Sequence, residues 1–166
     1  RLACRRRDYE EALEYIEKSM IRNWHNMKGR TLKAAILRTL GVDSTTFVKE
    51  CLKIDPLSQG CLYEQAAATD DYDLWLKTMR TESHNFKELA QEYIEAGLYE
   101  DAIRILRACP QKDPICWYTL GYVYKQLKEG EKAKEAFENG EKSCPDYCFP
   151  NRVEEIRILH SVIEAL

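Results

Sequence analysis

Cysteine and histidine are the residues of this chain best suited to bind a metal or to act as nucleophiles. The nearest approach to a metal motif is Cys144-x3-Cys148. Zinc requires four ligands, and no residue near this pair in the sequence completes a set. The histidines at positions 25, 84 and 160 lie in separate parts of the chain and share no motif with a cysteine or a carboxylate. We therefore predict no metal site and no cofactor.

The sequence also lacks the short motifs of common enzymes. It contains no Cys-x2-Cys, no His-Glu-x2-His, no glycine-rich phosphate loop and no Gly-x-Ser-x-Gly. Acidic pairs such as Glu10-Glu11 and Glu154-Glu155 are typical of solvated helix faces. A cysteine and a histidine could still meet in space as a nucleophile pair, because such partners need not be close in sequence. The resulting prediction is a protein without enzymatic activity.

The charge balance disfavours nucleic acid and membranes as partners. The net charge is −3, and the basic run from Arg5 to Arg7 is followed by acidic residues. This pattern provides no basic footprint for nucleic acid or an anionic membrane. No stretch reaches the roughly 20 apolar residues of a membrane span. The seven cysteines are odd in number and irregularly spaced, which is typical of buried thiols in a reducing compartment. We predict a cytoplasmic location.

A helical repeat is clearest between Pro114 and Pro145. Its other markers are Trp117, Leu120, Gly121, Tyr124, Ala133 and Phe137. Their spacing resembles the tetratricopeptide repeat, W-x2-L-G-x2-Y…A-x3-F…P. The resemblance implies two antiparallel helices whose large residues interdigitate, with Gly121 and Ala133 small because the helices cross closely there.

Weaker copies of the same pattern lie upstream. One copy consists of Phe86, Leu89, Ala90 and Tyr93, which have the same mutual spacings as Trp117, Leu120, Gly121 and Tyr124. Another is indicated by residues 9–16, which are similar to residues 99–106. We predict degenerate repeats over residues 1–82, clear repeats over 83–113 and 114–147, and a terminal helix over 151–166. All of them are assigned to one domain, residues 1–166, which we expect to be a fragment of a longer chain.

These elements predict an all-α fold, a right-handed α-α superhelix (solenoid) of the tetratricopeptide type. A helix pair cannot bury its apolar face alone, so neighbouring pairs stack. The terminal helix carries apolar residues on one face: Val153, Ile156, Leu159 and Ile163. We expect this face to pack on the preceding repeat and to leave Ile158 and Val162 open to a further unit. Exposed repeat ends of this kind also predict self-association.

The repeat geometry also predicts where a ligand would bind, because the first helices of such a stack line its concave side. The residues expected on that side are His84, Lys87, Gln91, Ile94, Tyr118, Tyr122 and Lys125. Tyrosine offers apolar area together with a hydroxyl, which suits a peptide or a polar ligand. The same residues could equally coat an ordinary surface. Tetratricopeptide domains that grip carboxyl-terminal peptides use Lys and Asn at these positions, and Gln91 departs from that set.

Several stretches resemble the helical tail of a family of large bacterial proteins of unknown function, whose amino-terminal part is β-rich and similar to carbohydrate-active modules. The stretches are residues 53–57, 89–102 and 145–152. The resemblance implies a superhelical tail attached to a sugar-processing or sugar-binding region. It carries over no catalytic residue.

Together, these observations predict a protein-interaction or intramolecular scaffold module. Its expected partner is a protein, a peptide or an adjoining domain of the same chain. The alternative is a non-catalytic helical part of a carbohydrate-processing protein that contributes Tyr118 and Tyr122 to a glycan cleft. Glycan binding by the longer protein, but not by the fragment, would favour that alternative.

Overall fold

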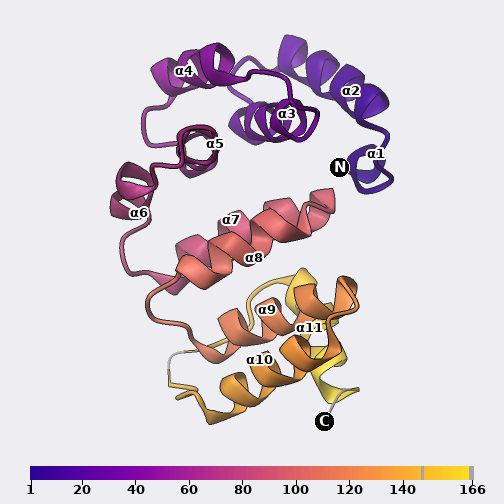
Figure 1. The fold of residues 1–166 in the computed structure, drawn as a ribbon, viewed down its shortest axis with the longest axis vertical. Helices are drawn as coiled ribbons and strands as arrows, with labels where there is room; N and C mark the ends of the chain where they lie inside the picture. Colours follow the sequence, from indigo (N-terminus) through magenta and orange to yellow (C-terminus); the bar gives the residue numbers. More distant parts are fainter. Residues whose placement is uncertain (147, 165–166) are drawn as a thin grey trace. The chain divides into compact units, whose positions relative to one another are not determined.

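The computed structural model describes residues 1–146 and 148–164, and this part of the chain contains helices and their connections but no strand (Figure 1). The predicted all-α class is confirmed. Tyr147, at the end of the second clear repeat, and residues 165–166 of the predicted terminal helix lie outside the described residues. None of the described helices is both long and apolar enough to cross a membrane.

The chain forms two compact units. Unit 1 comprises Arg1–Arg80 and Glu95–Gly97, and unit 2 comprises Thr81–Ile94 and Leu98–Leu166. The division after Arg80 falls close to the predicted change from degenerate to clear repeats at residue 83. Gly97 joins unit 1 because it packs on Arg5, whose Cα would lie 3.1 Å from a Cβ at Gly97.

Unit 1 contains short helices that pack on their neighbours in the sequence. They are α1 (Leu2–Arg5), α2 (Tyr9–Arg22), α3 (Met27–Thr39), α4 (Thr45–Ile54), α5 (Gln59–Thr69) and α6 (Asp73–Met79). Asp8 caps α2 by accepting a hydrogen bond from the Glu11 N–H, and Asn26 caps α3 by accepting one from the Gly29 N–H. Helix α3 contacts α2, α4 and α5, so it is the central helix of this unit.

Aromatic packing and a close helix crossing hold unit 1 together. The ring of Trp75 lies 5.3 Å from that of Tyr63 and 6.0 Å from that of Tyr72, between centroids, both edge to face. Helices α3 and α5 meet at Gly60, where a Cβ would lie 2.5 Å from Cγ2 of Thr31. Any larger residue would push these helices apart, so glycine is required for this crossing.

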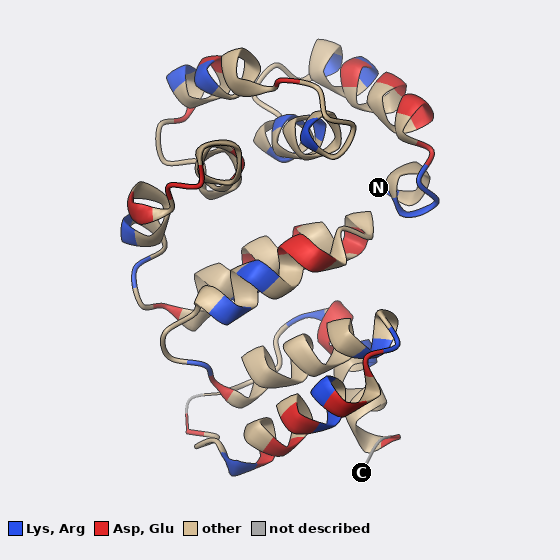
Figure 2. Ribbon diagram, viewed as in Figure 1, with Lys and Arg blue, Asp and Glu red and all other residues tan. Residues whose placement is uncertain are grey.

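Unit 2 holds the clear repeats. Its helices are α7 (Ser83–Ala96), of which Glu95 and Ala96 are assigned to unit 1, α8 (Tyr99–Ala108), α9 (Pro114–Gln126), α10 (Gly130–Lys142) and α11 (Val153–Ile163). Helix α9 is central and contacts α8, α10 and α11. The composition of the helices fits this central position. Figure 2 shows that α9 is almost free of charged residues, whereas Lys and Glu alternate along α10. A Cβ at Gly121 would lie 2.3 Å from the Phe137 ring, which confirms the predicted close crossing of α9 and α10.

The terminal helix packs with the opposite face from the one predicted. Ile158 and Val162 are buried, whereas Val153, Ile156 and Ile163 are 64–78% exposed. Both faces of this helix carry apolar residues, so the helical period alone does not say which one is covered. Buried Glu155 helps to fix the choice, since its carboxylate accepts hydrogen bonds from the N–H groups of residues 151 and 152 and caps the helix start.

Candidate functional site

The residues predicted for the concave face lie on α7 and α9, and the structure gives them different environments. His84 is exposed and lies 3.5 Å from the Glu88 carboxylate. Gln91 and Tyr122 are half-buried. Ile94 is only 4% exposed, so it belongs to the core and cannot line an open groove. The prediction that Ile94 lines the concave face was wrong, because this residue is buried together with the repeat markers of α7.

Lys87 ties α7 to the start of α9. Its Nζ lies 2.7 Å from Oδ2 of Asp113, and the Ser83 hydroxyl donates to the same oxygen at 2.6 Å. The other carboxylate oxygen of Asp113 accepts from the Cys116 N–H at 2.7 Å and so caps α9. Burial alone would raise the pKa of Asp113, but the hydrogen bonds from Lys87, Ser83 and Cys116 together hold it below its ordinary value. Lys87 is therefore engaged within the fold.

Replacing Asp113 by asparagine should remove this charge while keeping a side chain that can cap α9. Because the folded-state pKa is lowered, the carboxylate stabilises the fold above its unfolded pKa and loses that contribution as the pH falls through the folded value. We expect a loss of about 1 kcal/mol at neutral pH, measured by urea denaturation. The difference from the wild type should shrink below about pH 4. The same change at exposed Asp146 should have no effect, and a gap for Asp113 that persists in acid would contradict this assignment.

Tyr118 packs against α10. A Cβ at Gly140 would lie 2.3 Å from the Tyr118 ring, so the ring covers this glycine closely. Partial burial raises the pKa of the Tyr118 hydroxyl, and the negative charge of Glu141 adds to the effect. Tyr118 is thus half-buried, and less of its ring is available to a ligand than the sequence predicted.

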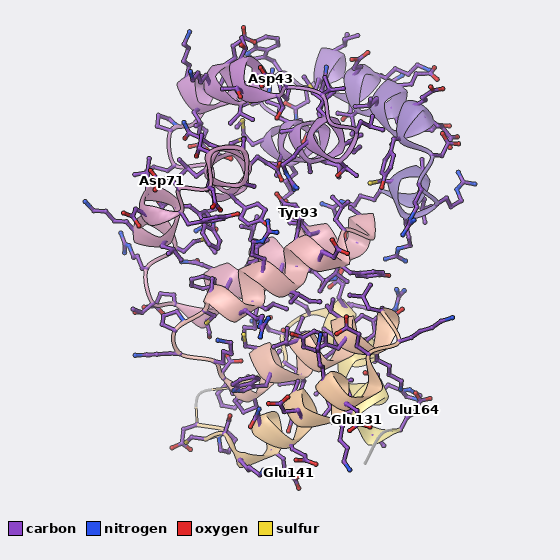
Figure 3. The ribbon with its side chains drawn as sticks, viewed as in Figure 1. Asp43, Asp71, Tyr93, Glu131, Glu141 and Glu164 are labelled. Carbon is purple, nitrogen blue, oxygen red and sulfur yellow. The ribbon has the colours of Figure 1, made fainter. Side chains whose placement is uncertain are left out.

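Lys125 reaches the end of the terminal helix. Its Nζ lies 3.4 Å from the Ser161 carbonyl oxygen and 3.1 Å from the carboxylate of Glu164, which Figure 3 labels just beyond α11. At the other end of α11, Arg152 forms an ion pair with Glu88 of α7. Polar contacts therefore anchor both ends of α11 to helices that carry the predicted site, and Ile158 and Val162 are buried between these anchors.

The sequence did not reveal these partners. No motif pairs Glu88 with Arg152, or Lys125 with Ser161, because the contacts join segments that are far apart in the chain. The one local signal was the apolar period that predicts a terminal helix over residues 151–166, and α11 forms within that range. It says nothing about the helix against which α11 packs.

A second surface of unit 2 lies around Trp117. Its role in the repeat pattern predicts a buried residue, but Trp117 is only half-buried. Its ring borders a hollow of about 300 Å³ lined by residues of α8, α9 and α10 and of the loop between α8 and α9. Lys112 Nζ lies 5.4 Å from the centre of the Trp117 ring, and Lys132 Nζ lies 5.7 Å from that of Tyr124. With Arg107, these lysines make the hollow both basic and aromatic.

Unit 1 has a larger hollow, of about 740 Å³, beside α1, α2 and α3. Apolar side chains line much of it, including Tyr15, Ile16 and Leu32. Metal ligands are not grouped there or elsewhere: across residues 1–146 and 148–164, no three His, Cys, Asp or Glu side chains are placed to hold a metal ion. Cys144 is exposed and Cys148 is half-buried.

Comparison with known proteins agrees with the repeat pattern. The family model of the tetratricopeptide repeat matches residues 115–147. Among solved structures, the chain is similar to a crystal structure of MamA, with 14% identity and a TM-score of 0.40 over 82% of this chain and 89% of that one. It is also similar to a MamA RS-1 ArsTM double mutant, with 18% identity and a TM-score of 0.39 over 96% and 91% of the two chains. A search of curated proteins gave no match. The matched segment covers nearly all of helices α9 and α10, which pack against each other as the repeat pattern predicts.

Proposed function

We propose that unit 2 is a protein-interaction module that binds an amphipathic helix against α7 and α9, and that α11 occupies this site within the same chain. The observation that carries the proposal is the way in which α11 is held. Ion pairs and a carbonyl hydrogen bond fix its two ends, and apolar side chains fill its middle. Tetratricopeptide repeats recur as peptide-binding and partner-binding surfaces, which agrees with this use of the fold.

The contacts of α11 define the chemistry of a suitable partner. Its buried residues Ile158 and Val162 are separated by one helical turn, so they lie on the same face. Lys125 donates to a carbonyl in the last turn, where the helix dipole favours a cation. A competing helix should therefore present two aliphatic residues four positions apart, an arginine before them and an acidic residue after them.

Occupation by α11 should weaken the binding of any external helix. A segment tethered by a short connection has an effective concentration in the millimolar range. Only residues 143–152 separate α10 from α11. An external partner must therefore displace α11 or bind to its outer face, where Val153, Ile156 and Ile163 are exposed together with Phe149.

The glycan-cleft alternative has less support in the packing. It relies on Tyr118 and Tyr122 as stacking residues for a sugar, yet the Tyr118 ring covers Gly140 and is half-buried. The resemblance to large bacterial proteins remains a prediction, as does binding to an adjoining domain of the same chain. Either partner would be compatible with a helix-binding surface on unit 2.

A peptide of residues 151–164, labelled with a fluorophore, tests the proposal. Against the wild-type chain it should bind weakly, because the site is filled. Against Ile158→Asp/Val162→Asp, whose own α11 loses its apolar contacts, it should bind at least about tenfold more tightly. Adding Lys125→Ala to that variant should weaken binding again. Fluorescence anisotropy measures all three affinities.

The matched control is Ile156→Asp/Ile163→Asp, which introduces the same charges on the exposed face of α11. This variant should bind the peptide as weakly as the wild type, since its own α11 stays docked. Circular dichroism checks that each variant keeps its helix content. Equal peptide affinity for the two double variants would mean that α11 does not occupy a binding site.

A further inference from the structure

Unit 1 buries an arginine beside two cysteines. Arg30 of α3 is 2% exposed, and Cys51 of α4 and Cys61 of α5 are both fully buried. The Arg30 guanidinium approaches Cys51 Sγ at 3.9 Å, and the Thr31 hydroxyl lies 3.6 Å from Cys61 Sγ. The two thiols also hydrogen bond to each other. Three helices thus bring a cation, a hydroxyl and a pair of thiols together in one buried cluster.

The positive charge of Arg30 has no acidic partner within the described part of the chain. Its Nε donates to the Trp24 carbonyl at 3.1 Å, its guanidinium stacks 4.4 Å from the Trp24 ring centre, and its Nη2 has no hydrogen-bond partner. Arg38, two turns later in α3, forms two hydrogen bonds with Glu64 instead. A buried cation without a counter-charge is costly, and ionising one neighbouring thiol would supply the missing negative charge.

The surroundings of the two thiols favour a thiolate on Cys61. The pKa of Cys61 is lowered to about 6, chiefly by the hydrogen bond from Cys51 and further by hydrogen bonds from Ser58 and Thr31. Burial and the charge of Glu64 act in the opposite direction and raise this pKa. The same thiol contact raises the pKa of Cys51. At neutral pH the pair therefore holds one nucleophilic sulfur and one proton-bearing thiol, an arrangement typical of redox-active cysteines.

We propose that Cys51 and Cys61 form a peroxide-sensitive thiol pair in which Cys61 is oxidised first and Cys51 then closes a disulfide. The oxidant is hydrogen peroxide, which is small and uncharged enough to reach a buried site. The Cys61 thiolate sulfur attacks one peroxide oxygen, so an S–O bond forms, the O–O bond breaks, and the released hydroxide takes a proton to become water. Cys61 is then a sulfenic acid, and the peroxide has been reduced by two electrons.

The second step uses Cys51. Its thiol loses a proton and its sulfur attacks the sulfur of Cys61, so the S–S bond forms and the S–O bond breaks. The departing hydroxide takes up that proton and leaves as water. In total, two thiols and one peroxide give one disulfide and two water molecules. Arg30 acts as a positioning residue: its charge beside Cys51 favours the loss of the Cys51 proton in this second step, and its Nη2 group is available to donate to the leaving oxygen.

The experiment exposes the reduced full chain to limiting hydrogen peroxide, blocks the remaining thiols under denaturing conditions, and maps the peptides by mass spectrometry. A Cys51–Cys61 disulfide should form at least about tenfold faster than Cys4 reacts, because Cys4 is a buried thiol whose pKa is raised by burial. The Cys109–Cys116 pair is the internal comparison, since its thiols also contact each other but the cation near them is Lys112, whose ammonium donates to the carbonyl oxygens of Arg107 and Cys109. It should be oxidised more slowly.

Variants separate the two steps. Cys51→Ser should stop at the Cys61 sulfenic acid, which a cyclic 1,3-dione traps, and Cys61→Ser should give neither product. Arg30→Gln should slow disulfide formation by about tenfold, and Arg30→Lys should restore part of the rate. If the Arg30 variants do not fold, the rates of the different cysteines within the wild-type chain still decide the matter. Oxidation of Cys61 no faster than Cys4, or equal rates for the two pairs, would overturn the proposal.

Discussion

Replacing Arg38 by methionine should destabilise unit 1 by roughly 3–5 kcal/mol, because the change takes a paired guanidinium away from a buried carboxylate. Glu64 is fully buried, and the Arg38 guanidinium donates to both of its carboxylate oxygens, at 2.8 and 3.2 Å. The buried charge of Glu64 then loses both of these hydrogen bonds. Urea denaturation followed by circular dichroism measures the loss, and hydrogen exchange of the α3 and α5 amides should localise it to unit 1.

The control for this prediction removes both charges. Arg38→Met/Glu64→Gln keeps the size of the side chains but buries no charge, so it should recover much of the stability lost in the single variant. Lys33→Met, in the same helix, removes the partly exposed ion pair with Glu17 and the contact of the ammonium with the Phe47 ring, and it should cost less than about 1 kcal/mol. A single Arg38 variant as stable as the Lys33 variant would show that Glu64 is not held by this pair.

The sequence predicted the repeat architecture best where local rules agree. Between residues 114 and 145, an initial proline and a full set of markers indicate the same helix pair, and α9 and α10 form there. Glycine at position 121 is informative for a steric reason, since only a residue without Cβ fits against Phe137. The degenerate repeats gave weaker signals because their packing relies on individual contacts, such as that of Trp75 with Tyr63.

The candidate site was less predictable because it depends on contacts between distant segments. The terminal helix has apolar residues on two faces, and the buried face is the one that contains Ile158 and Val162. Ion pairs at both ends, including that of Arg152 with Glu88, help to hold this orientation. Periodicity detects the presence of an apolar face but not its partner, which explains both this error and the one at Ile94.

The cluster around Arg30 was invisible in the sequence for the same reason. Arg30 and the two cysteines lie on three successive helices, α3, α4 and α5, and no spacing rule connects them. The sequence predicts buried thiols, and Cys51 and Cys61 are indeed buried. Their surroundings differ, however. Only the fold places the Arg30 guanidinium beside Cys51.

Replacing Gly121 by leucine should destabilise unit 2 by more than about 3 kcal/mol, at the upper end of what overpacking costs. A Cβ alone would lie 2.3 and 2.5 Å from two carbons of the Phe137 ring and 3.1 Å from the Ala133 carbonyl oxygen. Phe137 is 1% exposed, so its ring has little room to move away. Helices α9 and α10 must therefore separate, which exposes the apolar contacts that define the repeat. Thermal denaturation of the variant and the wild type measures the effect.

A double-mutant cycle identifies the cause. Phe137→Ala alone should cost about 3–5 kcal/mol by leaving a cavity, and this cavity is the space that a leucine at position 121 requires. The combined variant should therefore be more stable than the sum of the two losses predicts. Gly130→Ala provides the control, because no atom lies within 4 Å of its Cβ position at the start of α10. Strictly additive losses for Gly121→Leu and Phe137→Ala would mean that the close approach of these two residues does not limit the crossing of α9 and α10.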